Sequence, residues 1–91
     1  MKTLPDHVTA YKKTPVFDQD SMPAGLLKTH RTKEGTWGVL NVLEGSVVFC
    51  PEQQSTEKVS LSAGDQWVIQ PEQAHHLELN GPVSCYVEFY K

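Results

Sequence analysis

Short segments in which apolar and polar residues alternate run through most of the chain. The clearest four span 37–43, 46–50, 66–69 and 83–90, and they are rich in β-branched and aromatic side chains. Such residues favour strands because they pack well on a pleated, half-buried surface. No window places apolar residues at helical spacing over three turns after a capping residue. The pattern therefore predicts an all-β protein.

Turn signals separate these segments at short intervals. They fall at Pro5-Asp6, Thr14-Pro15, 22–25, 33–35, Glu44-Gly45, 63–65, Pro71 and 80–82. About eight short strands divided in this way are typical of a sandwich, a jelly roll or a small barrel. Because Glu44-Gly45 lies between two apolar segments, we predict a tight hairpin there, with Gly45 at a positive φ.

The size of the chain limits its core. It has 91 residues, of which 38% are hydrophobic, and no linker, repeat or low-complexity segment divides them. A domain of this size removes only about 60 to 65% of its unfolded surface from water. Small cores are often supplemented by a metal, by disulfides or by a partner subunit. We therefore predict a single domain over residues 1–91 and expect a homodimer.

Charge and hydropathy exclude some partners. The net charge of −3 comes from 8 basic and 11 acidic residues without long runs of one sign, which argues against a nucleic-acid partner. No apolar run approaches the roughly 18 residues of a membrane span, and residues 1–5 lack the apolar core of a signal peptide. Cys50 and Cys85 are flanked by apolar residues, so we expect buried, reduced thiols. A cytoplasmic protein with no membrane partner is the expectation.

Metal-ligand chemistry is concentrated near the end of the segment 71–80. Residues two apart in a strand share a face, so His76, Glu78 and Asn80 project together if the strand starts at His76. His75 then points to the other face, together with two leucines. Because an apolar face ordinarily faces the core, His75 remains the alternative to His76 as the histidine that points inward.

A resemblance to cupins is carried by Gly64-Asp65, Pro71, His76 and Asn80, which are similar to the second conserved cupin motif. The sequence departs from that motif at Gln73, where a glycine is usual. The first cupin motif is matched only at His30, because Thr32 stands where its second histidine would be. The usual site of three histidines and one glutamate is therefore incomplete.

A longer match covers nearly the whole chain. It includes 11–17, 23–27, 30–38, 42–45 and 87–90, of which 30–38 is the most distinctive. These segments resemble the small cupin domain at the N-terminus of tellurite-resistance protein B, which also occurs as the stand-alone YeaR-like proteins. The resemblance implies a cupin-type double-stranded β-helix, a jelly roll of about eight short strands. It also implies a link to tellurite, other oxyanions or nitrosative stress.

We predict one divalent metal ion, Zn²⁺, Fe²⁺, Ni²⁺ or Mn²⁺, held by His30, His76 and Glu78. Glu34 and Glu88 are the alternative carboxylates, the first in a turn and the second in a strand. Three protein ligands leave a coordination position open for a small-molecule or anionic ligand. Three functions fit this site: a binding module, a metal-dependent enzyme, oxygenase- or isomerase-like, with a two-histidine, one-carboxylate centre, and a structural domain whose metal only supplements a thin core.

Overall fold

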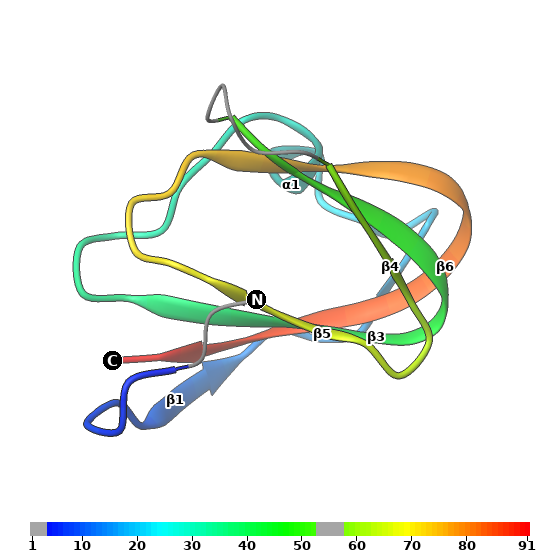
Figure 1. Ribbon diagram of the computed structural model, residues 1–91. Helices are drawn as coiled ribbons and strands as arrows, with labels where there is room; N and C mark the ends of the chain where they lie inside the picture. The colour runs from blue at the N-terminus through cyan, green and yellow to red at the C-terminus, as the bar shows by residue number, and fades with distance from the viewer. Residues whose placement is uncertain (1–3, 53–57) are drawn as a thin grey trace.

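The computed structural model describes residues 4–52 and 58–91, and it is all-β apart from one helical turn (Figure 1). The elements in chain order are β1 (Ala10–Lys13), β2 (Phe17–Asp18), α1 (Ala24–Leu27), β3 (Trp37–Pro51), β4 (Val59–Ser62), β5 (Gln66–Ile69) and β6 (His75–Tyr90). All strand pairs are antiparallel, in the order β1-β6-β3-β4, with β2 also on β6 and β5 also on β3. The predicted all-β, cupin-type fold is confirmed.

The two long strands, β3 and β6, form the frame of the molecule. They pair along their whole length, from Trp37 opposite Tyr90 to Pro51 opposite His75. Both bend together, so that one sheet curls back over itself (Figure 1). β5 extends the half of the sheet that holds 38–41, and β4 extends the half that holds 46–49. The inner faces of these two halves enclose the core.

The predicted hairpin at Glu44-Gly45 is wrong, because β3 runs through these residues without a turn. The register instead shifts between Val42 and Glu44 and again between Gly45 and Val47, opposite β6. Such bulges insert extra residues into one strand and increase its bend and twist. Gly45 does take the predicted positive φ, +69°. A glycine that resembles a turn signal in the sequence therefore serves as the bend of a continuous strand.

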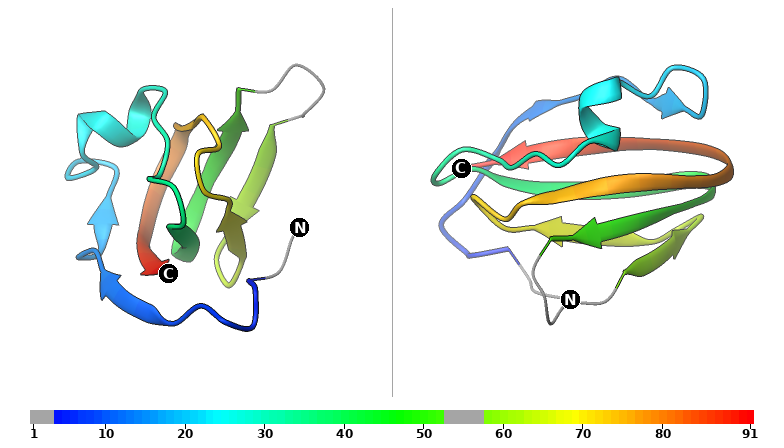
Figure 2. Two further views of the ribbon diagram at one scale, coloured as in Figure 1. Left: turned by 90° about the vertical axis from the view of Figure 1, so that its left-hand side faces the viewer. Right: turned by 90° about the horizontal axis from the view of Figure 1, so that it is seen from above.

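The core lies between the two halves of the curled sheet. Phe49, Leu40 and Val47 are its largest fully buried apolar side chains. Alternation along β3 places Leu40 inside on one half of the sheet and Val47 and Phe49 inside on the other, and the irregular pairing between the halves changes which alternate positions face inward. Met22 belongs to the same cluster, and Leu26 of α1 packs against it. The short helix lies at one end of the roll, next to β6 (Figure 2).

Both cysteines, Cys50 and Cys85, are buried free thiols, as predicted. Burial raises the pKa of the Cys85 thiol. Cys85 belongs to the apolar core cluster, whereas Cys50 is buried outside that cluster. Among the described residues, no helix is long and apolar enough to cross a membrane.

Candidate functional site: a cationic pocket inside the roll

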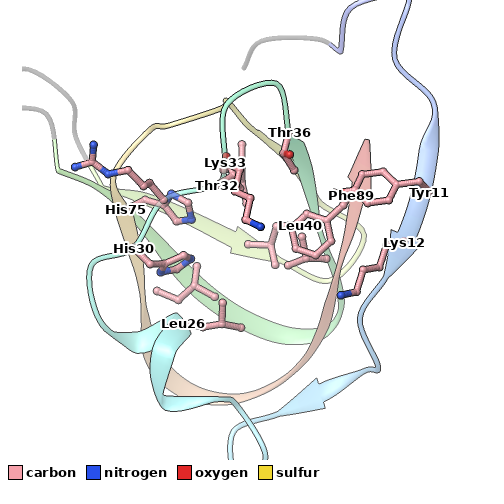
Figure 3. A pocket seen from close by; sticks show the side chains of 14 residues that line it. Tyr11, Lys12, Leu26, His30, Thr32, Lys33, Thr36, Leu40, His75 and Phe89 are labelled. Atoms are coloured by element: carbon pink, nitrogen blue, oxygen red, sulfur yellow. The ribbon is translucent and has the colours of Figure 1, made fainter. Parts of the chain in front are cut away.

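A pocket of about 350 Å³ opens between the curled sheet and the segment that joins α1 to β3 (Figure 3). Apolar side chains from four elements line it. They are Leu26, Leu40, Ile69, Leu77, Val87 and Phe89. These residues come from the inner faces of β3, β5 and β6 and from α1, so the pocket continues the core outward. An apolar ligand body would be removed from water here.

Positive charge gathers at the same pocket. Lys12, Arg31 and Lys33 are among the residues that line it, and none of the described lining residues is Asp or Glu. Figure 3 shows the ammonium ends of Lys12 and Lys33 directed into the pocket. Cations beside a low-dielectric wall attract an anion more strongly than they would in open water.

Two histidines form part of the wall. The rings of His30 and His75 meet edge to face with their centroids 4.2 Å apart. His75 also stacks on Phe49 at 5.1 Å. The two backbones are joined by a pair of hydrogen bonds, His30 N to His75 O at 2.9 Å and His75 N to His30 O at 2.8 Å. This bridge holds the segment around residue 30 across the start of β6.

Hydrogen bonding assigns the neutral tautomer of both rings. The Nδ1 atom of His30 lies 2.9 Å from Lys28 O, and that of His75 lies 2.7 Å from Gln73 O. A carbonyl oxygen only accepts, so each Nδ1–H donates, and in the neutral ring the lone pair is on Nε2. Burial lowers the pKa of His75 from its ordinary value and keeps this ring neutral near pH 7.

A second group of polar side chains lies on the opposite face of the same strands. His76 is directly opposite Cys50 in the β3–β6 ladder, and Glu78 follows two residues later. The ligand atoms of these three side chains all lie within 4.8 Å of one another. His76 Nε2 is 3.3 Å from Glu78 Oε2. Lys58 contacts both oxygens of Glu78, at 3.2 and 3.1 Å.

Glu52 completes this outer group. Its carboxylate accepts from His76 Nδ1 and, at 3.0 Å, from Thr29 Oγ1. The hydrogen bond from His76 is the main reason that the pKa of Glu52 is lowered, and the same bond raises the pKa of His76. Lys58, then His76, lower the pKa of Glu78. Desolvation, then the charge of Glu78, raise the pKa of the Cys50 thiol.

The structure brings two of the three predicted metal ligands together and leaves the third elsewhere. His76 and Glu78 share a face, as their spacing predicted, whereas His30 lies at the inner pocket beside His75. His75 therefore takes the inward position that the alternation left open. Of the alternative carboxylates, Glu34 is exposed near the turn at Gly35, and Glu88 accepts a 2.8 Å hydrogen bond from Tyr90.

Sequence reasoning missed Cys50 and Glu52 as neighbours of His76. Their proximity depends on the register between β3 and β6, which pairs Cys50 with His76 across 26 positions of sequence. The predicted hairpin at Glu44-Gly45 would have paired the segment 46–50 with 36–43 instead. No local signal in the sequence reveals the correct partner strand.

The rolled antiparallel sheet, closed around an interior pocket, is a cupin-like fold. A cupin-2 domain-containing protein from Shewanella frigidimarina has the same fold, with a TM-score of 0.52 and 14% identity over 92% of this chain and 65% of that one. Over residues 12–87 the sequence matches the model of the TehB-like domain, and the chain belongs to that family. The resemblance drawn from the sequence is therefore confirmed.

The relatives show how much of a longer protein this domain represents. Haemophilus influenzae "Probable S-adenosyl-L-methionine-dependent methyltransferase TehB" is 28% identical over 92 residues, 96% of this chain and 32% of the relative. The crystal structure of TehB from that organism matches with a TM-score of 0.85 and 27% identity, over 93% of this chain and 32% of its own. The chain thus spans about a third of these relatives.

A structure from Escherichia coli strain K12, determined by a structural genomics consortium, matches over almost its full length. The TM-score is 0.88 at 22% identity, with coverage of 100% of this chain and 97% of the other. At that identity the likeness shows a shared fold only.

Proposed function

We propose that this domain is a small-molecule-binding cupin module that takes a small organic anion into the pocket inside the roll. The observation that carries the proposal is the combination of an apolar interior with Lys12, Arg31 and Lys33 and no acidic residue among the described lining. A volume of about 350 Å³ is within the range of pockets that bind small molecules.

The pocket chemistry defines the ligand. A compact apolar or aromatic body would cover Leu40, Leu77 and Phe89, and a carboxylate or other oxyanion head would face the cations. The ammonium groups of Lys12 and Lys33, which are directed into the pocket (Figure 3), would bind the oxyanion head as flexible point charges. The free Nε2 atoms of His30 and His75 would accept hydrogen bonds from a hydroxyl or amino group on the ligand.

A metal ion inside the pocket is not part of this proposal, because the residues there do not fit one. Cupins of the usual kind hold a metal through several histidines and a glutamate. Here the described lining supplies only the imidazoles of His30 and His75, with no carboxylate and no thiol. The alternative of an oxygenase- or isomerase-like enzyme requires His30, His76 and Glu78 to converge, and the proposal does not include it because His30 lines the pocket whereas His76 and Glu78 do not.

A role in oxyanion stress is part of the same proposal, and family membership supports it. Tellurite or a related inorganic oxyanion would use the cationic side chains but leave the apolar wall uncovered. The wall therefore favours organic anions over inorganic ones as the ligand class.

Isothermal titration calorimetry with matched ligands tests the proposal. Benzoate and phenylphosphonate are compared with the neutral benzamide and with tellurite. We expect the two organic anions to bind more tightly than benzamide and tellurite, because only they satisfy both the cations and the apolar wall. If benzamide binds as tightly as benzoate, or if no organic anion releases heat, the proposal is wrong.

Matched lysine variants locate the binding. Lys33→Gln removes a charge that faces the pocket, whereas Lys28→Gln removes one from an exposed residue that does not line it. Loss of one charge-assisted hydrogen bond, about 1.5 to 3 kcal/mol, corresponds to roughly 10- to 100-fold weaker binding. We expect that loss in Lys33→Gln and unchanged affinity in Lys28→Gln. Equal effects of the two substitutions would show that only net charge matters.

A further inference from the structure

The cluster on the outer face of β3 and β6 has the composition of a metal site, separate from the inner pocket. We propose that Cys50, His76 and Glu78 bind one zinc-type divalent cation, with Glu52 positioning the imidazole. The three ligand types are a thiolate, an imidazole and a carboxylate, all of which zinc accepts. Their two negative charges would balance the charge of the ion, and three protein ligands leave a fourth position for water.

The distances between ligand atoms are close to those that a tetrahedral ion requires. Zinc binds nitrogen and carboxylate oxygen at roughly 2.0 to 2.2 Å, so two such ligands at a tetrahedral angle lie about 3.3 to 3.5 Å apart. His76 Nε2 and Glu78 Oε2 are 3.3 Å apart. Cys50 completes a group whose ligand atoms all lie within 4.8 Å of one another. A thiolate bound at about 2.3 Å would lie about 3.5 to 3.7 Å from the other two ligand atoms, so an approach of at most about 1.3 Å is needed.

The backbone already holds these side chains in place. Cys50 and His76 are direct partners across two hydrogen-bonded strands, and Glu78 lies on the same face of β6. Three ligands on two adjacent paired strands need no loop movement to meet. Cys50 is 2% exposed, so it would form the dry side of the site, while the less buried His76 and Glu78 would form the open side.

The neighbours of the ligands orient them as partners in metal sites do. Glu52 accepts from His76 Nδ1, which directs Nε2 toward Glu78 and Cys50. A carboxylate on the second nitrogen is the common way in which proteins fix a metal-binding histidine. Lys58 Nζ holds Glu78 Oε1 at 3.2 Å and also contacts Oε2 at 3.1 Å. Metal binding would leave the Oε1 contact in place and replace the Oε2 contact.

The site is also tied to the segment that forms the wall of the pocket. Glu52 accepts a 3.0 Å hydrogen bond from Thr29 Oγ1, next to His30. Metal binding would fix Glu52 and therefore stabilise the docking of this segment on β6. The inference does not depend on the organic-anion proposal, because no residue of the outer cluster lines the pocket.

Cobalt is the probe that tests this site, because a thiolate bound to Co²⁺ gives a charge-transfer band in the near ultraviolet. The metal-stripped, reduced protein is titrated with Co²⁺, and zinc is then added in competition. We expect a band that saturates at one cobalt per chain and disappears when zinc is added. Absence of the band in the wild-type protein overturns the proposal and leaves the cluster as an ion-pair group.

Variants assign the ligands. Cys50→Ser should remove the band, and the control Cys85→Ser should keep it, because Cys85 is the other buried thiol and lies outside the cluster. His76→Gln and Glu78→Gln, which alter partly exposed residues, should weaken cobalt binding at least tenfold, and Glu52→Gln roughly 10- to 100-fold. His30→Gln should leave it unchanged. A band that survives in Cys50→Ser, or an equal loss in His30→Gln, contradicts the assignment.

Two further measurements distinguish a folding defect from loss of metal binding, and distinguish failure of the metal proposal from failure of the organic-anion proposal. Circular dichroism of each variant shows whether the strands remain, and the glutamine variants carry the test if Cys50→Ser does not fold. Organic-anion binding is measured with EDTA present, where the outer site holds no metal. If the protein binds the organic anion equally well with and without EDTA, but gives no charge-transfer band in the cobalt titration, the metal proposal is wrong and the organic-anion proposal stands.

Discussion

Gly45 is the position at which a single methyl group should damage the fold most. Its φ is +69°, and an added Cβ would lie 1.9 Å from Pro82 O, 2.8 Å from Pro82 C and 3.0 Å from Val83 Cα. These are backbone atoms of the paired strand β6, so no side chain can rotate away. β3 and β6 would have to separate at the bend, where Val47 and Val83 are both buried.

The loss of stability in Gly45→Ala has two parts. A left-handed backbone costs a residue with a Cβ about 1 to 2 kcal/mol. Forcing the strands apart adds about 1 to 3 kcal/mol, as overpacking in a core does. The total, about 2 to 5 kcal/mol, is a large fraction of the roughly 5 to 14 kcal/mol expected for a domain of this length.

Gly35→Ala is the matched control for this substitution. Gly35 has a similar φ, +77°, but nothing lies within 4 Å of its added Cβ. It should therefore lose only the backbone part, about 1 to 2 kcal/mol. Equilibrium unfolding in urea gives both free energies of unfolding. Equal losses in the two variants would refute the idea that the close approach of β6 to Gly45 makes the bend.

Three other predictions concern the core, one carboxylate and the oligomeric state. Phe49 is 0% exposed, so Phe49→Ala should lower the free energy of unfolding by about 3 to 5 kcal/mol in the same assay, and a loss below about 1 kcal/mol would contradict its place in the core. Hydrogen bonds from Ser21 N and Asp20 N lower the pKa of Asp18, so its stabilising contribution is present above its ordinary pKa of 3.8 and is lost as pH falls through the lower folded value. Wild-type protein should therefore lose more stability than Asp18→Asn on acidification, and parallel curves would contradict this. Light scattering after size-exclusion chromatography should give the mass of a homodimer, as the small core suggests, and a monomer mass would contradict it.

The strands were predictable because their signal is local. Segments such as 37–43 and 83–90 are rich in β-branched and aromatic residues, and each lies within a strand of the structure. His76 and Glu78 also lie side by side as their spacing predicted, because residues two apart on a strand share a face. Both inferences need only the geometry of an extended chain.

Pairing between distant strands was not predictable from local signals. Glu44-Gly45 has the composition of a hairpin turn, but the same composition suits a bulge, and the choice depends on β6 lying alongside. The predicted grouping of His30 with His76 depended on the same information. Leu77 packs in the core, so His75, two residues earlier on the same strand, also faces inward. The backbone bridge between His30 and His75 then places His30 at the pocket.

The most direct test of the proposed function is to map where an organic anion binds. Backbone amide spectra of ¹⁵N-labelled protein are recorded while phenylphosphonate is added. Binding inside the roll predicts shifts that saturate and concentrate on pocket residues such as Thr32, Lys33, Leu77 and Phe89. Shifts centred on the outer face at His76 and Glu78, or no saturable shifts at the pocket, would contradict it.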